Sequence, residues 1–472
     1  MMTERNTAIC AGLGYTIGNI FIKGINFLTL PLFSRLMTPA EFGTYNIFLS
    51  YDAILSIILG LAMYTSVRSA HYEFEDTDKY VSSISLFYIL NAFLFLLGLL
   101  YWGGNLSSLL GVNLNLLFLL VPFSFGGGII QLYNQRISLN YDFKKYLLIG
   151  FANSFGNVAL SLILIFTFFR YNPAMGRIIG TVGTIFSISI ILLWDMMKKS
   201  PLQYNYGFWK FGVLYSLPIV PHGLSQVILG QCDRIMIANM VSVSAAGIYS
   251  LAGNLQLVLA VITNSIGTSW STWFYEQMRK QNYNEIQKNA ELLARIFLAF
   301  CLILLAISPE IIYIIGGSNY EQGKFVAIPL IMSGFIIFLY SIIVPSEYYT
   351  KNTIYIMYGT VTAAIINLIT NYIFIRMFGY IAAGYTTLFS YSCYLFLHFI
   401  FSRKLIRFDI VPVQKLIIML SLLIVFNCIV FIAMDYIAIR YIGSIVSVIV
   451  LCKPLIKQGT QIFSKVRGEK SI

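Results

Sequence analysis

The feature that most constrains this chain is a series of apolar segments, each long enough to cross a lipid bilayer as a helix. A membrane-spanning helix needs about 20 predominantly apolar residues, and about 14 segments of the 472-residue sequence meet that requirement. Only 11% of the residues are charged, against about 25% in soluble domains. The sequence therefore predicts an all-α, polytopic membrane protein. The expected spans are 11–37, 43–66, 82–102, 114–136, 146–168, 175–195, 211–232, 245–268, 292–315, 325–346, 355–376, 381–402, 414–434 and 437–456.

Lys and Arg residues are distributed unevenly between the two sides of these spans. With the N-terminus in the cytoplasm, 23 fall on the cytoplasmic side and 7 on the opposite side. Cytoplasmic loops carry the excess of positive charge, so both termini are predicted to be cytoplasmic. Topology also accounts for the net charge of +12, and we expect no nucleic-acid partner. Met1 to Asn6 lack a basic n-region, so we expect no cleavable signal peptide here.

Two halves of the chain share a short motif. Gly43-Thr44-Tyr45 and Gly247-Ile248-Tyr249 both open an apolar segment, and they are 204 residues apart. Internal repeats of this kind are a recurring architecture of transporters. We therefore expect an N-terminal lobe over residues 1–200, a C-terminal lobe over 201–405, and two further helices with a basic tail over 406–472.

The first span carries a charge near its middle. Tyr15, Asn19, Lys23 and Asn26 have the spacing of one helical face. A charge inside the bilayer is costly and normally faces a polar interior, so Lys23 is predicted to line a cavity. The alternatives are a lysine that snorkels to the interface or one that pairs with an acid such as Asp52.

Polar residues also form stripes along other spans. A single stripe usually provides hydrogen bonds between helices, but several stripes in both halves predict a shared, water-accessible cavity. Prolines inside spans predict broken helices, with simple packing kinks as the alternative. The cavity candidates are Gln135, Arg136, Asn153, Asn157, His222, Gln226, Asn367 and Asn371.

An Asp233-Arg234 pair lies at the predicted outer end of the span 211–232. Its expected role is a salt bridge or cap that fixes the lobe, with a direct substrate role as the alternative. His71 and His398 are interpreted as loop and interface residues. No phosphate-binding loop, catalytic triad or metal-ligand spacing is found, so we expect no cofactor, no metal site and no enzymatic activity.

Three motifs carry a resemblance to a known family. They are Pro31-Leu32-Phe33-Ser34-Arg35 followed by Phe42-Gly43-Thr44-Tyr45, then Asp233-Arg234-Ile235-Met236-Ile237 followed by Gly247-Ile248-Tyr249-Ser250, and Asn367…Asn371 followed by Phe378-Gly379-Tyr380-Ile381-Ala382-Ala383-Gly384. With about 14 spans and no large loop, the chain resembles the Wzx-like flippases of O-antigen and capsule synthesis. Ala383-Gly384 departs from the Gly-Ala order that is frequent in that family.

The resemblance implies two six-helix lobes around a central cavity, two extra C-terminal helices, and alternating access without ATP hydrolysis. It implies a bacterial inner-membrane protein that moves an undecaprenyl-diphosphate-linked oligosaccharide to the outer leaflet. Membrane lipids, a polysaccharide polymerase and a chain-length regulator are further candidate partners. The rival functions are a cation-coupled drug antiporter of the same superfamily, an integral-membrane polymerase and a non-transport membrane scaffold.

Overall fold

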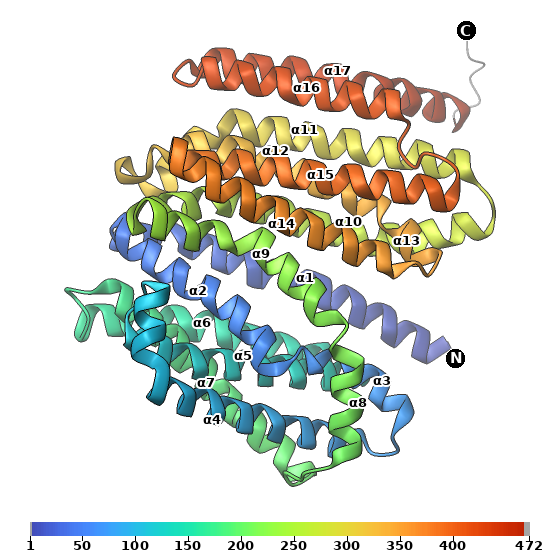
Figure 1. Cartoon of the computed structure of the whole chain (residues 1–472). Coiled ribbons are helices and arrows are strands. Elements are labelled where there is room, and N and C mark those ends of the chain that lie inside the picture. Colours follow the sequence, from blue (N-terminus) through green and yellow to red (C-terminus); the bar gives the residue numbers. More distant parts are fainter. Residues whose placement is uncertain (1, 467–472) are drawn as a thin grey trace. The chain divides into compact units, whose positions relative to one another are not determined.

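The computed structural model describes residues 2–466, with the side chains of residue 12 and residues 14–451. This part of the chain is helical and contains no β-strand. Figure 1 shows the long helices that result. The prediction of an all-α protein is confirmed.

The helices form two compact units, the first ending at Gly247 and the second beginning at Ile248. The predicted lobe boundaries at residues 200 and 405 follow the internal repeat, and they stay a prediction. The first unit contains α1 (Met2–Leu36), α2 (Pro39–Gly60), η1 (Met63–Ser66), α3 (Val67–Glu73), α4 (Thr77–Leu110), α5 (Leu114–Leu139), α6 (Phe143–Thr167), α7 (Pro173–Lys199), α8 (Tyr206–Ser216), α9 (Ile219–Met240) and the start of α10 (Val243–Arg279). The second contains the rest of α10, α11 (Tyr283–Gly316), η2 (Ser318–Tyr320), α12 (Gly323–Ile343), α13 (Pro345–Tyr349), α14 (Thr353–Phe378), α15 (Ile381–Ile406), α16 (Val413–Ile432) and α17 (Ile437–Val466).

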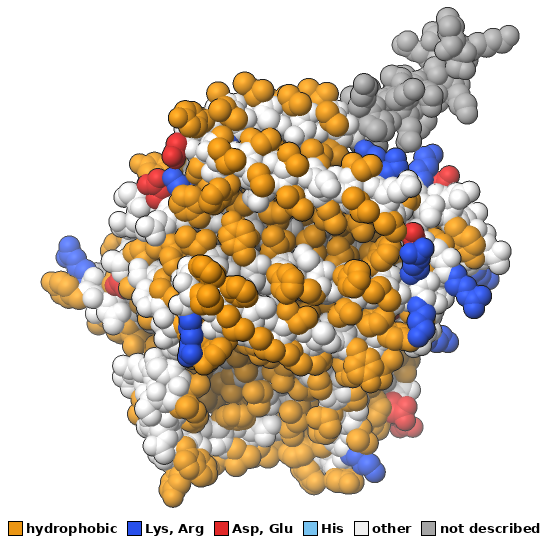
Figure 2. All heavy atoms as spheres, turned by 45° about the horizontal axis from the view of Figure 1, so that its top comes forward, with side chains coloured by type: hydrophobic (Ala, Val, Ile, Leu, Met, Phe, Trp, Pro, Cys, Tyr) orange, Lys and Arg blue, Asp and Glu red, His pale blue; other side chains and the backbone are white. Residues whose placement is uncertain are grey.

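A helix covers the greater part of every predicted span, but the count of fourteen membrane crossings is not confirmed. In the described residues, 11 helices are long and apolar enough to cross a membrane, or up to 12 if the bent pair α8–α9 is one span. α15 is not among them, since it carries Thr386, Thr387, Ser390 and His398 in its interior. The apolar part of α17 that is described, Ile437–Leu451, is short. Most side chains visible in Figure 2 are hydrophobic, as expected for surfaces that meet lipid.

The start of α2 shows how local sequence sets a helix boundary. Thr38 caps the helix: its hydroxyl accepts a hydrogen bond from the Glu41 backbone N–H (3.3 Å), and its own N–H donates to the Glu41 carboxylate (2.8 Å). Pro39 occupies the first helical position, where its missing N–H costs nothing. α2 thus begins four residues before the predicted span 43–66. It also ends earlier, because Leu61 and Ala62 adopt positive φ angles of 47° and 52°.

Proline breaks the span predicted over 211–232. The helix axis bends by 50° between α8 and α9, with Pro218 at the break. Proline removes a backbone hydrogen bond and clashes with the preceding turn. The prediction of a broken helix is confirmed here.

Each unit has its own apolar core. In the first unit, α4 and α5 contribute the fully buried side chains Val81, Ile84, Ile129 and Leu132. In the second unit, α12 is buried along most of its length and packs against α11 and α15. The rings of Phe297 on α11 and Phe338 on α12 are stacked 3.9 Å apart. α16 and α17 run beside α11, as Figure 1 shows.

Candidate functional site

A polar network joins α6 to α7 in the first unit. Asn157 Oδ1 accepts hydrogen bonds from the hydroxyls of Thr181 (3.0 Å) and Ser161 (3.3 Å). The Tyr45 hydroxyl, from α2, lies 3.5 Å from that of Thr181. One turn before Asn157, Asn153 has a buried Oδ1 with no hydrogen-bond partner among the described residues. The polar stripe predicted on this helix therefore serves, at Asn157, as a contact between helices.

Arg177 lies beside this network, on α7. Its guanidinium carbon is 3.4 Å from the centre of the Phe33 ring and 5.1 Å from that of Tyr45, the geometry of a cation–π contact. In the described part of the chain, its buried Nε and Nη1 atoms have no hydrogen-bond acceptor. A permanently charged group with two free N–H donors is suited to bind an anion.

The face predicted on α1 is divided between two environments. Asn19 accepts a hydrogen bond from the Tyr146 hydroxyl on α6 (2.9 Å), and the Tyr15 ring packs edge-on against Tyr146. Lys23 and Asn26, further along α1, are exposed on the unit. No carboxylate of the described residues lies within 4.0 Å of Lys23.

The alternative pairing of Lys23 with Asp52 is not present. Asp52 Oδ1 instead accepts a hydrogen bond of 2.5 Å from the hydroxyl of Ser124 on α5. Asp52 thus links α2 to α5, and it does not neutralise the charge of Lys23.

At the start of α4, Arg136 forms an ion pair with Asp78 and is 7% exposed. A pocket of about 310 Å³ adjoins the pair and is also lined by His71, Asp76 and Lys199. The backbone N–H of Lys79 donates to Asp76 (3.0 Å) and lowers the pKa of that carboxyl. Arg136 thus ties α5 to α4, while the neighbouring Gln135 is partly exposed.

The candidates on α9 lie beyond the break at Pro218. His222 and Gln226 are partly exposed, whereas Asp233 is buried. Arg234 donates through Nη1 to the carbonyl of Gly230 (2.6 Å) and to the side chain of Gln231 (3.1 Å). Both contacts lie within α9, and the expected role of the Asp233-Arg234 pair as a salt bridge or cap stays a prediction.

The second unit repeats the asparagine arrangement of the first. Asn371 on α14 donates to Asn367 (3.1 Å) and accepts from the hydroxyl of Thr386 on α15. Asn371–Thr386 therefore matches Asn157–Thr181 on the corresponding helices. Both asparagines of α14 are fully buried. The structure places this stripe between helices, so it does not line an open cavity within the second unit.

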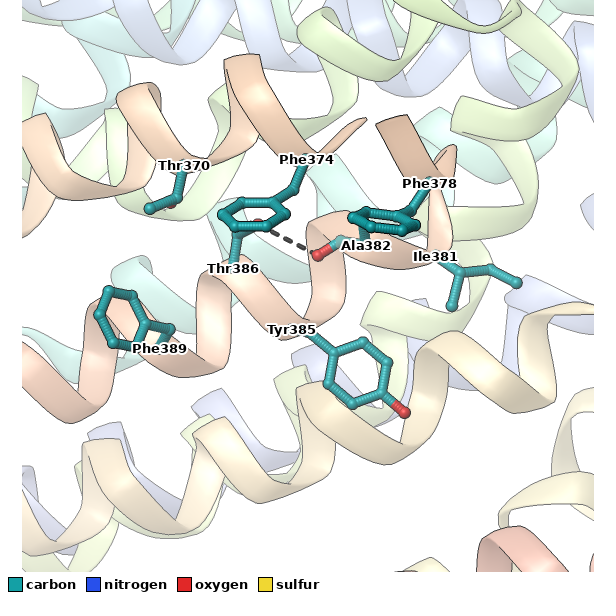
Figure 3. Close-up of a pocket in the computed structure, with 8 residues that line it drawn as sticks. All are labelled: Thr370, Phe374, Phe378, Ile381, Ala382, Tyr385, Thr386 and Phe389. Carbon is teal, nitrogen blue, oxygen red and sulfur yellow. Dashed lines mark hydrogen bonds between the residues drawn. The ribbon is translucent and has the colours of Figure 1, made fainter. Parts of the chain in front are cut away.

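An apolar pocket of about 630 Å³ lies at the end of α14 and the start of α15. In Figure 3, Phe374 and Phe378 project from α14, and Tyr385 and Phe389 from α15. Among its eight lining residues, the hydroxyl groups belong to Tyr385, Thr370 and Thr386. Such a lining suits an acyl or prenyl chain better than a sugar, which needs several hydrogen-bond partners. It was not predicted from the sequence, because apolar and aromatic residues like those of its lining occur in every span.

The described residues contain no group of three His, Cys, Asp or Glu side chains that could hold a metal ion. The first unit offers instead polar groups that lack a hydrogen-bond partner among the described residues, on Asn153 and Arg177, and exposed ones on Lys23 and Asn26. This arrangement suits the binding and movement of a polar ligand.

Comparisons with known proteins relate this chain to polysaccharide biosynthesis proteins. The model of a family described as "Polysaccharide biosynthesis protein" matches residues 9–271. The chain is 27% identical over 361 residues to the capsular polysaccharide biosynthesis protein CapF of Staphylococcus aureus, covering 71% of this chain and 85% of that protein. It is 22% identical over 272 residues to the succinoglycan biosynthesis transport protein ExoT of Rhizobium meliloti, covering 54% and 52%.

Solved structures with the same fold are transporters. The lipid II flippase MurJ, in an inward closed conformation, superposes with a TM-score of 0.72 at 15% identity, covering 94% of this chain and 99% of that one. An inward-facing multidrug resistance MATE transporter of the MOP superfamily gives a TM-score of 0.63 at 12% identity, covering 80% and 94%. These two likenesses establish the fold, while the family match covers more than half of the chain. The chain therefore belongs to the polysaccharide biosynthesis protein family, as a multi-pass membrane protein with this transporter fold.

Proposed function

We propose that this polysaccharide-related transporter is a flippase for oligosaccharide repeat units linked to undecaprenyl diphosphate. It would carry them from the cytoplasmic to the outer leaflet of the bacterial inner membrane by alternating access, for assembly of O-antigen or capsule. The family match supports the link to polysaccharides. The name of the Staphylococcus aureus relative supports capsule, and the lipid II flippase with the same fold supports a lipid-linked substrate.

The observation that carries the proposal is the state of Lys23. This lysine lies within the candidate span Gly14–Leu36, is exposed on its unit, and has no carboxylate within ion-pair distance among the described residues. A charge at the centre of a membrane helix costs about 2.5–3.5 kcal/mol on insertion scales. A diphosphate would offset that cost, because an anion and a cation attract strongly where the dielectric constant is low.

The other candidates support the proposal in different ways. Arg177 offers a second cation with free N–H donors, and the exposed Asn26 with the partly exposed His222 and Gln226 could bind sugar hydroxyls. Gln135 and Asn153 remain candidates. Asn19, Arg136, Asn157, Asn367 and Asn371 have partners within their own units, so their first role is to hold helices together.

A drug antiporter of the same superfamily is the rival. It would need an acidic residue inside the first span, and the sequence from Gly14 to Leu36 contains none. The charge present there has the opposite sign, which favours an anionic substrate.

Deletion of the gene tests the proposal. The mutant should accumulate lipid-linked repeat units that are accessible only from the cytoplasmic face, and it should lose the surface glycan. Deletion of the glycosyltransferase that starts the repeat unit is the matched control, because it removes the glycan without accumulation. Normal surface glycan in the flippase-gene mutant would refute the proposal.

A reporter fused to the C-terminus should behave as cytoplasmic, and co-purification would identify a polymerase or chain-length regulator as a partner.

A further inference from the structure

A buried carboxylate–imidazole pair, which includes none of the cavity candidates, lies in the second unit. Glu347 belongs to the short helix α13, and His398 belongs to α15. Glu347 Oε1 and His398 Nδ1 are 2.6 Å apart, and both side chains are 0% exposed. A distance this short is typical of a hydrogen bond between charged groups.

Tyrosines and phenylalanine surround the pair. The rings of Tyr340 on α12, Tyr394 on α15 and Phe401 on α15 all pack against the His398 ring. Tyr340 and Tyr348 are ionisable groups that interact electrostatically with Glu347, and Tyr275 on α10 acts in turn on Tyr348. No Lys or Arg nitrogen of the described residues lies within 4.0 Å of the carboxylate.

Each member of the pair also has one buried atom without a partner. Glu347 Oε2 and His398 Nε2 make no hydrogen bond with any described residue. His398 Nε2 faces α14 at Gly359, where an added Cβ would lie only 2.3 Å from it. Burying an unsatisfied polar atom costs about 1–3 kcal/mol, so two such atoms in one cluster indicate more than a packing contact.

Charge decides which protonation state this site can hold. With a single proton, on Nδ1, the pair would carry a net charge of −1 in an apolar environment with no cation beside it. With a second proton, on Nε2, imidazolium and carboxylate neutralise each other, and the cost of burying a net charge disappears. The buried arrangement therefore favours binding of one additional proton.

We propose that Glu347 and His398 form a proton-binding site whose occupancy holds α13 against α15. A proton from water binds at His398 Nε2 while the pair is exposed, and closure of α13 then buries the neutral pair. Release of that proton leaves the net charge behind and drives α13 away from α15. This gives the transporter a proton-dependent conformational step. The inference goes beyond the proposed function, and it stands whatever substrate is carried.

Nitrogen-15 NMR of histidine-labelled protein in lipid nanodiscs tests proton binding directly. The chain has three histidines, His71, His222 and His398, and His398→Asn and His71→Gln variants assign the signals. We expect His398 to keep the imidazolium signal at about pH 7.5, where an ordinary histidine is about 90% neutral. His71 is the internal control. In Glu347→Gln the imidazolium signal should be lost at that pH. A neutral His398 in the wild-type protein at pH 7.5, or a signal unchanged by Glu347→Gln, would overturn the proposal.

Hydrogen exchange of the α13 amides tests the conformational step. After correction for intrinsic exchange, protection of residues 345–349 should fall about tenfold per pH unit as the pH rises from about 6.5, where an exposed histidine loses its proton, to the pH at which the His398 signal changes. Within that range opening is linked to release of one proton, and above it the protection should level off. The same peptide in Glu347→Gln should show no such step. Protection that does not depend on pH in the wild-type protein would refute the coupling even if His398 binds the proton.

Discussion

Gly43 and Gly247 lie against each other at the first turns of α2 and α10. A Cβ atom on Gly43 would lie 2.1 Å from the Val243 carbonyl oxygen, and one on Gly247 would lie 1.9 Å from the carbonyl oxygen of Pro39. The contact is reciprocal: Pro39 and Val243 are separated by the same 204 residues as the two glycines. The glycine that marks the repeat in the sequence is thus the residue that lets the repeated elements meet.

Substitution of either glycine should destabilise the protein. In Gly43→Ala and Gly247→Ala the new methyl group meets backbone atoms that cannot rotate away, and overpacking of this kind costs about 1–3 kcal/mol. Size-exclusion chromatography of samples heated to increasing temperatures measures this loss of stability. Gly98→Ala on α4 is the matched control, because a Cβ there meets nothing within 4 Å. Equal stability of Gly43→Ala and Gly98→Ala would contradict the close approach.

The buried asparagines of α14 should show strongly non-additive effects. Asn371→Leu leaves the buried Asn367 amide without its side-chain partner, which costs about 1–3 kcal/mol. The double variant Asn367→Leu/Asn371→Leu should lose less stability than the sum of the two single variants, since it leaves neither amide unpaired. The comparison variant is Asn157→Leu on α6, whose site is less buried. Simple additivity of the melting temperatures would show that the two amides do not act together.

Much of the fold was predictable from local sequence, whereas the surroundings of each helical face were not. Apolar length, the Thr38 cap and the proline at residue 218 depend on a few neighbouring residues, so helices and breaks could be identified. Helical spacing placed Asn367 and Asn371 on one face, but it could not decide whether that face meets water or α15. In a membrane protein both the interior and the lipid-facing surface are apolar, so hydropathy does not tell whether a helical face meets lipid or another helix.

The surroundings of three charged or titratable groups, Arg177, Glu347 and His398, could not be predicted from the sequence for the same reason. Arg177 follows a short loop and has the pattern of any arginine that sets topology. Glu347 and His398 are 51 residues apart, and each alone resembles an ordinary residue near the end of a span. Only the packing of α12, α13 and α15 brings them together.

An ion pair between a buried arginine and a partly exposed glutamate should hold α17 in the second unit. Arg440 on α17 is 1% exposed and binds the Glu310 carboxylate on α11 through both Nη atoms, at 3.0 and 2.5 Å. Loss of a hydrogen bond to a charged group costs about 1.5–3 kcal/mol. Arg440→Gln should therefore make the segment after residue 406 sensitive to limited proteolysis, and Arg440→Met/Glu310→Met should recover most of the resistance. Resistance in Arg440→Gln equal to that of the wild-type protein would exclude this role.

The guanidinium of Arg177 should matter for transport more than for folding. Arg177→Met keeps a long side chain against Phe33 but removes the charge and the free N–H donors, so expression should be normal and most of the surface glycan lost. Arg177→Lys should retain part of the activity, because it keeps the charge without the planar fork. Immunoblots of glycan and of protein in the same cells separate the two effects. Full glycan in Arg177→Met would reduce Arg177 to a packing residue.

Lys23 gives the sharpest test of the proposed function. Because an apolar residue is cheaper than a charge inside a membrane helix, Lys23→Ala should insert and express at least as well as the wild-type protein. It should nevertheless lose surface glycan and accumulate lipid-linked repeat units, since the cation that attracts the diphosphate is gone. Lys23→Arg should keep part of the activity, because the positive charge persists.

Asp52 supplies the control for this experiment. It accepts a hydrogen bond from Ser124 and forms no ion pair with Lys23, so removing its charge should not repair the loss. Lys23→Ala/Asp52→Ala should therefore be as inactive as Lys23→Ala alone, with the amount of protein in the membrane measured alongside. If the double variant instead restores the full surface glycan, Lys23 serves only to neutralise Asp52, and its proposed role in substrate binding is wrong.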